Sequence, residues 1–282
     1  MPLDELLIAI ALGAYTLGAL ALLLYFFTRD DALLRAGIPL AIVGCVTQFV
    51  QLIARYELSH VWPLLNLYGS LSLFSAMSVA IYIGFAFRYR LWFAGGFVLA
   101  LAGIFLAYGV TWYEGTMPPV PSLQSYWAKI HVPIVVSSYA AFLVAFVFSS
   151  IYLLKYYAGR RVAVGAQDDT AARRWFDALP SLPQLDVVVY RAVAIGLPLI
   201  TVGIITGAMW AKESWGAYWQ WDPKETAALF SWIIYLAYMH LHTRHAWRGL
   251  RTNWVSVIGF VSIIFCYLGV NIWISGLHSY KV

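Results

Sequence analysis

Charged residues are scarce in this chain. Only 11% of its 282 residues are Asp, Glu, Lys or Arg, whereas 62% are hydrophobic, and its mean hydropathy is +0.75. A soluble domain typically carries about twice that share of charge, because its surface must be hydrated. The composition therefore excludes an ordinary water-soluble protein and predicts a chain that lies in a lipid bilayer.

Cysteine is also scarce, and the common catalytic motifs are absent. Cys45 and Cys266 lie far apart inside apolar stretches, so we interpret them as packing residues rather than as a metal-ligand pair. A redox pair would require both thiols at one depth and facing each other. There is no Walker motif, no dinucleotide fingerprint and no nucleophile elbow. Any chemistry must therefore come from a cofactor or a partner.

Hydrophobic runs of roughly 20 residues, the length that spans about 30 Å of hydrocarbon, recur along the chain. They predict an all-α, polytopic integral membrane helical bundle that forms a single membrane domain over residues 1–282. An acidic start precedes the first run, which favours a retained span over a cleaved signal peptide. We expect about eight transmembrane helices, at 7–27, 34–54, 67–87, 91–110, 131–154, 188–209, 226–243 and 254–274.

The basic residues indicate the orientation. Thirteen of the eighteen lysines and arginines lie in or beside the loops after the first, third, fifth and seventh spans, and such loops stay cytoplasmic. This places both termini outside, makes 155–187 a cytoplasmic loop and puts 210–232 on the outer face. The charge is spread over several short loops rather than gathered in one patch, so we expect no nucleic-acid partner.

Five of the thirteen tryptophans fall within 210–232. Tryptophan offers a wide π face and one N–H donor, so a cluster at the membrane border is suited to hold a large flat ring while its polar edges stay hydrated. The obvious ligand of this kind is haem. We therefore predict an outer haem-binding loop over 210–232 that leads into the span 226–243.

The tetrad Asp222-Pro-Lys-Glu225 has two compatible interpretations. Asp222 suits the N-cap of a helix, proline the first helical position, and Glu225 completes a capping box. A helix N-terminus with Lys224 beside it is also a favourable place for an anionic group such as a haem propionate.

Two histidines are expected on the same face as the tryptophans. His131 lies at the outer start of the span 131–154, and His278 follows the outer end of the span 254–274. Imidazole is a usual axial ligand of haem iron. The topology alone therefore makes His131 and His278 candidate ligands.

His240 is expected elsewhere, because fifteen residues after Glu225 place it roughly 22 Å below the loop. An ionisable residue at that depth indicates a function, although it could equally be a residue at the frayed cytoplasmic end of its helix. His242 and His245 are predicted to be cytoplasmic surface residues, and His60 an outer loop residue.

Residues 215–226, which read Trp-Gly-Ala-Tyr-Trp-Gln-Trp-Asp-Pro-Lys-Glu-Thr, resemble the WWD signature of haem-handling proteins. The form matches the CcsA (ResC) family of system II cytochrome c biogenesis. The chain departs from the usual family pattern at Leu65, Gly69 and Ala227, none of which is a proposed ligand. Weaker similarity extends over 63–71, 123–131, 238–240 and 276–280.

The resemblance implies that His131 and His278 are paired axial ligands of a haem b. It implies that His240 forms an inner haem site with a histidine of the partner subunit CcsB (ResB). The implied activity is that of a holocytochrome c synthetase subunit, which attaches haem to the CxxCH motif of apocytochrome c. The platform residues would be Trp215, Tyr218, Trp219, Trp221, Asp222 and Lys224.

The same resemblance implies a bacterial plasma membrane or a thylakoid membrane, with a thioredoxin-like thiol reductant as a further partner. Two other functions stay open at this point. A bis-histidine membrane electron carrier would also use paired histidines, although usually within its spans. A HemX-like haem-binding regulator or scaffold is the second, although it would be expected to lack an intact WWD tract.

Overall fold

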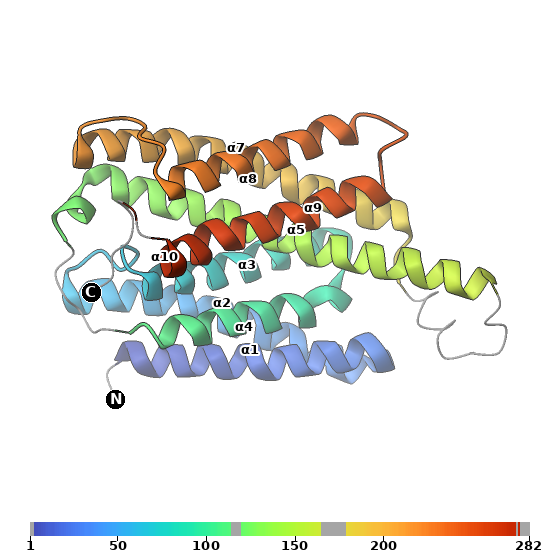
Figure 1. Ribbon diagram of the computed structural model, residues 1–282. Helices are drawn as coiled ribbons and strands as arrows, with labels where there is room; N and C mark the ends of the chain where they lie inside the picture. Colours follow the sequence, from blue (N-terminus) through green and yellow to red (C-terminus); the bar gives the residue numbers. More distant parts are fainter. Residues whose placement is uncertain (1–2, 114–119, 165–178, 275, 277–282) are drawn as a thin grey trace. The chain divides into compact units, whose positions relative to one another are not determined.

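The structure is a computed structural model that describes residues 3–113, 120–164, 179–274 and 276. This part of the chain is helical and contains no strand (Figure 1). Its elements are α1 (Leu3–Thr28), α2 (Asp31–Ser59), α3 (Leu67–Tyr89), η1 (Trp92–Ala94), α4 (Gly95–Val110), η2 (Pro121–Gln124), α5 (Tyr126–Val164), α7 (Leu182–Trp215), α8 (Pro223–His242), α9 (Leu250–Ile264), η3 (Phe265–Gly269) and α10 (Val270–Trp273).

Seven helical stretches of the described chain are long and apolar enough to cross a membrane by length and composition. The 20-residue helix α8 corresponds to the remaining predicted span. The predicted all-α, multi-pass membrane fold is therefore confirmed. Hydropathy located these helices because each must satisfy its own backbone hydrogen bonds inside lipid.

Two helices extend well beyond the spans predicted for them. Helix α5 covers Tyr126–Val164 and α7 covers Leu182–Trp215, whereas about 20 residues suffice to cross the hydrocarbon. Both ends of the predicted loop 155–187 are therefore helical. The outer stretch 210–215 forms the last turns of α7 instead of a loop.

The chain divides into two compact units. Unit 1 comprises residues 1–141 and 198–220, and unit 2 comprises residues 142–197 and 221–282. Each unit contains one part of α5 and one part of α7. The WWD tract is divided as well, with residues 215–220 in unit 1 and Trp221 onward in unit 2.

Unit 1 has a core built from α1, α2, α3 and α4. Large side chains that are fully or almost fully buried, among them Tyr15, Leu22 and Leu99, fill its centre. Close helix contact depends on small residues, as is usual in membranes. A Cβ atom on Gly44 would lie 2.6 Å from the Tyr15 ring, so α1 and α2 can approach this closely only because that position has no side chain.

A chain of polar side chains runs through this apolar core. The Tyr15 hydroxyl donates to Gln48 Oε1 at 2.6 Å, and Gln48 Nε2 donates to the Ser72 carbonyl at 2.8 Å. The Ser72 hydroxyl donates to Gln51 Oε1 at 3.1 Å, and Gln51 Nε2 donates to the Tyr68 hydroxyl at 3.2 Å. Mutual pairing removes the cost of placing these groups in an apolar interior.

The network ends at a buried ion pair near the predicted outer face. Arg55 lies 3.5 Å from Asp4 and stacks over the rings of Tyr68 and Tyr113, at 4.7 and 5.0 Å from their centroids. The Tyr113 hydroxyl donates to Asp4 at 3.4 Å. This cluster joins the first turn of α1 to the last turns of α2 and the start of α3.

Unit 2 is held by aromatic stacking between its helices. The rings of Phe142 and Tyr235 are stacked with centroids 3.6 Å apart, and those of Phe146 and Phe260 lie 4.7 Å apart. A Cβ on Gly259 would lie 2.8 Å from the Tyr235 ring. The inner half of α5 therefore packs directly on α8 and α9.

Candidate functional site

His131 is held by a hydrogen bond to α7. Its Nδ1 lies 2.7 Å from the carbonyl oxygen of Gly203, and a carbonyl oxygen can only accept, so Nδ1 carries the proton. In the neutral ring Nε2 then keeps its lone pair. Metal-binding histidines are commonly fixed in this way, because the hydrogen bond at one nitrogen sets the tautomer and raises the basicity of the other.

Two glycines of α7 make the contact with His131 possible. A Cβ on Gly207 would lie 2.8 Å from Cε1 and 2.9 Å from Nδ1 of the imidazole, and a Cβ on Gly203 would clash with Val135. The two glycines are four residues apart and so lie on one face of α7. Sequence reasoning missed them, although small residues at this spacing are a recognised signal of close helix packing in membranes.

Trp210 supports the imidazole from the end of α7. Its ring centroid lies 5.7 Å from that of His131 and 5.2 Å from that of Trp215. Its Nε1 donates to the Ser122 carbonyl at 2.8 Å, and only 4% of the residue is exposed. Trp210 is therefore a fixed wall beside the imidazole, whereas Trp215 is half-buried at the edge.

Residues from 63–71, from 123–131 and from the last turns of α7 meet in one small apolar cluster of unit 1. Leu123 and Trp210 are buried in it, and Leu65, Trp127 and Trp215 pack against it. Leu65 lies in the segment 63–71 and is one of the residues at which the chain departs from the usual family pattern. The cluster explains physically why these separate stretches occur together with His131.

The exposed part of the loop in unit 1 begins at Gly216. This residue directly follows α7 and has a φ of +82°, a left-handed conformation that glycine usually supplies at the end of a helix. Lys212 Nζ donates to its carbonyl at 2.8 Å and lies 5.7 Å from the ring centroid of Tyr218. Tyr218 is exposed and Trp219 is half-buried, so a second pair of aromatic side chains follows Trp215 directly.

The unit 2 part of the tract starts α8 as predicted. Asp222 accepts from Lys224 N at 2.9 Å, and its own N–H donates to Glu225 Oε2 at 3.2 Å. The capping box is thus confirmed, and Asp222 is only 5% exposed. Trp221, before the cap, has a φ of +57° and is 68% exposed. That backbone conformation is uncommon for a bulky residue.

Lys224 precedes the predicted span and directs its amine toward α10. Its Nζ donates to Asn271 Oδ1 at 2.8 Å. Burial lowers the pKa of the Lys224 ammonium, and nearby Cys266 and Asp222 oppose that shift. The partner amide is neutral, so this hydrogen bond does not pair Lys224 with an opposite charge. Cys45 and Cys266 are both buried and are not joined in a disulfide, in agreement with their predicted packing role.

Three other histidines, His60, His240 and His245, are exposed. His278 lies outside the described residues, although Gly276 is placed beside Asp222, whose Oδ2 would lie 2.6 Å from a Cβ on that glycine. His240 is exposed in the last turn of α8, two residues before its end. His60 and His245 are exposed, as expected.

The prediction of His242 as a surface residue is wrong. It is 8% exposed, and its Nε2 lies 3.0 Å from Asp186 Oδ2. Its ring stacks on Tyr190 and Tyr238, with centroids 4.6 and 5.8 Å away. Two residues rotate a helix by about 200°, so His242 lies on the packed side of α8 while His240 lies on the open side.

Comparisons with known proteins decide the family. The family described as Cytochrome C assembly protein matches residues 64–278. The chain belongs to this family. It is 33% identical to the cytochrome c biogenesis protein CcsA of Guillardia theta, over 98% of this chain and 93% of the relative. It is 34% identical to CcsA of Parasynechococcus marenigrum (strain WH8102), over 99% of this chain and 97% of the relative.

A solved structure shares the fold. Cytochrome c Heme Lyase CcmF superposes with a TM-score of 0.69 and 20% identity, covering 94% of this chain but 46% of that chain. The chain thus spans about half the length of this structural neighbour. The resemblance to CcsA, the multi-pass membrane character and a role in cytochrome c maturation are confirmed. The individual ligand residues stay predictions.

Proposed function

We propose that this chain binds haem at the outer membrane face and presents it for covalent attachment to apocytochrome c, as the haem lyase subunit of a synthetase. The observation that supports this most directly is the hydrogen bond from His131 Nδ1 to the Gly203 carbonyl. It favours the tautomer whose Nε2 can bind iron.

The surroundings of His131 suit a porphyrin. Trp210 is buried against the imidazole, and Trp215 and Tyr218 continue the aromatic surface toward the exposed edge. Aromatic rings supply large, rigid contact areas for a flat ligand. We infer that these side chains hold the ring system while the histidine binds the iron.

The remaining site residues enter as parts of the same proposal. His278 is the second axial ligand, Trp219 and Trp221 extend the platform, and Lys224 at the capped start of α8 interacts with a propionate. His240, exposed on α8, forms the inner haem site with CcsB, through which haem is delivered.

The attachment chemistry places few demands on the chain itself. Each thioether forms when a cysteine S–H of apocytochrome c adds across a haem vinyl group, with sulfur and hydrogen ending on the two vinyl carbons, so no oxidant is consumed. Both cysteines of the chain are buried, and the thiols come from the substrate. Catalysis then consists largely of holding haem and peptide in a productive geometry.

The visible absorption spectrum of the purified protein, co-expressed with CcsB, tests this proposal. We expect a six-coordinate low-spin haem that is lost or shifted in His131→Ala and in His278→Ala, and that added imidazole restores. His60→Ala is the matched control, because His60 is an exposed histidine on the same predicted face.

A haem-free wild type, or a spectrum that neither variant changes, would contradict the assignment. A change caused only by His240→Ala would move the bound haem to the inner site. Covalent cytochrome c yield, measured in the same strains by haem staining, connects the ligands to maturation.

A further inference from the structure

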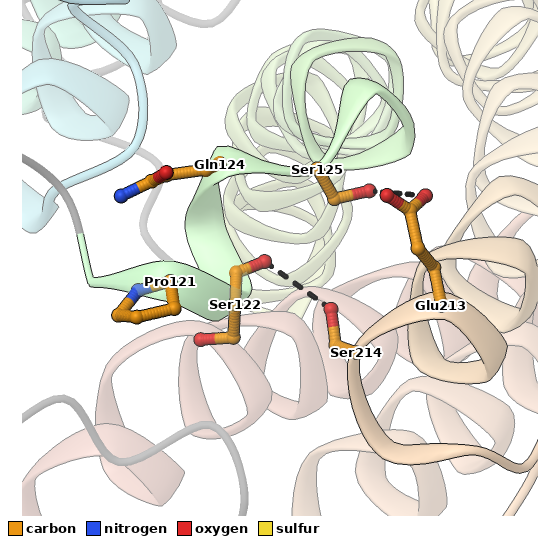
Figure 2. A pocket seen from close by; sticks show the side chains of 6 residues that line it. All are labelled: Pro121, Ser122, Gln124, Ser125, Glu213 and Ser214. Carbon is orange, nitrogen blue, oxygen red and sulfur yellow. Dashed lines mark hydrogen bonds between the residues drawn. The ribbon is translucent and has the colours of Figure 1, made fainter.

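A polar pocket lies beside the proposed haem ligand in unit 1. It has a volume of about 350 Å³ and is formed by η2, the residue that follows η2, and the last turns of α7. Figure 2 shows the polar side chains that these parts of the chain contribute. The lining residues are Pro121, Ser122, Gln124, Ser125, Glu213 and Ser214.

The pocket wall is fixed by hydrogen bonds. Ser125 Oγ donates to Glu213 Oε2 at 2.8 Å, and Ser214 Oγ donates to the Ser122 carbonyl at 3.2 Å (Figure 2). The same carbonyl accepts from Trp210 Nε1 at 2.8 Å. Because Trp210 also packs on His131, one indole supports both the pocket and the imidazole.

The chemistry of the lining selects a cation. Among the described residues that line it, Glu213 is the one ionisable group, and the other polar groups are hydroxyls, an amide and a backbone carbonyl. Lys212, the nearest basic residue in sequence, directs its amine to the Gly216 carbonyl instead. A ligand that donates several N–H bonds to a carboxylate and its neighbours, such as an ammonium or a guanidinium group, matches this set.

The position of the pocket limits what carries that cation. Ser125 directly precedes α5, and His131 follows six residues later, roughly 9 Å along the helix axis. An extended peptide covers this distance in about three residues. The volume is near the lower limit for ligand pockets, so it fits one side chain rather than a domain.

We propose that this pocket binds a lysine or arginine side chain of apocytochrome c, about three residues from the CxxCH motif, and so aligns the thiols with haem held at His131. The inference rests on the proposed function and adds to it a recognition site for the peptide. Glu213 is the residue that determines the preference, and Ser125 positions its carboxylate.

Fluorescence anisotropy with labelled peptides tests the pocket in the full chain. The peptides contain Ser-x-x-Ser-His, so that no thioether forms, with a lysine three residues before or three residues after this motif, or with glutamine at both places. We expect one lysine peptide to bind about three- to fivefold more tightly than the glutamine peptide, as for an ion pair of the exposed Glu213. This difference should shrink at high salt.

Protein variants complete the cycle. The amide in Glu213→Gln can still accept the Ser125 hydrogen bond, so this variant should lose the preference for lysine without weaker binding of the glutamine peptide. Glu213→Lys should reverse the preference. Glu57→Gln, an exposed acid on the same predicted face, should leave the preference unchanged.

Equal binding of the lysine and glutamine peptides by the wild type would overturn the proposal, and so would a preference that survives Glu213→Gln. The haem spectrum is recorded in parallel. A haem-free wild type refutes the proposed function, whereas intact haem in the wild type and the variants without a lysine preference refutes only the peptide pocket.

Discussion

Replacement of Gly207 by alanine is the sharpest test of how α7 positions His131, the proposed haem ligand. The new Cβ would lie 2.8 Å from Cε1 and 2.9 Å from Nδ1 of His131, whereas ordinary contacts begin at 3.4 Å. The imidazole must therefore move by about 0.6 Å, or α7 must withdraw. Either movement disturbs the 2.7 Å hydrogen bond to Gly203 and changes the direction of Nε2.

The size of the expected loss in haem affinity follows from the cost of overpacking. One inserted methyl group in a tight site typically costs about 1–3 kcal/mol, and that energy opposes haem binding if ligation requires the original ring position. Every 1.4 kcal/mol corresponds to tenfold in affinity, so we expect the haem dissociation constant of Gly207→Ala to rise at least about fivefold. A red or blue shift of the Soret band should accompany it.

The assay is haem titration of the purified protein, followed at the Soret band. Gly84→Ala is the control, because Gly84 lies in helix α3 of the same unit and has no atom within 4 Å of its added Cβ. Helix propensity alone favours alanine by about 1 kcal/mol, so the control should be neutral or stabilising. Unchanged affinity and spectrum in Gly207→Ala would refute the idea that this contact sets the ligand geometry.

Two further predictions concern the other unit and the buried network. Lys224→Met should weaken binding of haem about tenfold, as expected for a hydrogen bond to a charged group, but should leave binding of haem dimethyl ester unchanged. Lys129→Met, at an exposed lysine, is the control. Equal losses of affinity for haem and for its dimethyl ester would exclude a propionate contact. Gln48→Leu should lower the free energy of unfolding by about 1–3 kcal/mol, because the Tyr15 hydroxyl loses its buried acceptor. Tyr15→Phe in the same background should recover part of that loss, as measured by thermal denaturation. A fully additive double variant would show that the two side chains are not coupled.

The sequence was sufficient to predict the helices because lipid imposes one dominant constraint. A span must be apolar for about 20 residues and must pair its own backbone, so composition alone located α1 to α4. The ends of α5 and α7 were not predictable in this way. Beyond the hydrocarbon a helix can continue on any sequence with adequate propensity, and no transfer energy marks where it stops.

Periodicity would have corrected one histidine. His242 occurs in a polar stretch with Arg244 and His245, and this alone suggested a surface residue. A separation of two residues places His240 and His242 on opposite sides of α8. Asp186 Oδ2 lies 3.0 Å from His242 Nε2. That partner is 56 residues away in sequence, so only the packing of α7 on α8 could reveal it.

The candidate site shows where residue identity stops being informative. An aromatic loop flanked by histidines indicates a haem platform, because those side chains carry the π surface and the ligand atoms themselves. Whether His131 can bind iron depends on the location of one proton, and a backbone carbonyl of α7 determines it. That carbonyl comes within reach through Gly203 and Gly207, which contribute only the absence of a side chain. The tautomer of His131 is therefore a property of helix packing, which the motif containing His131 does not encode.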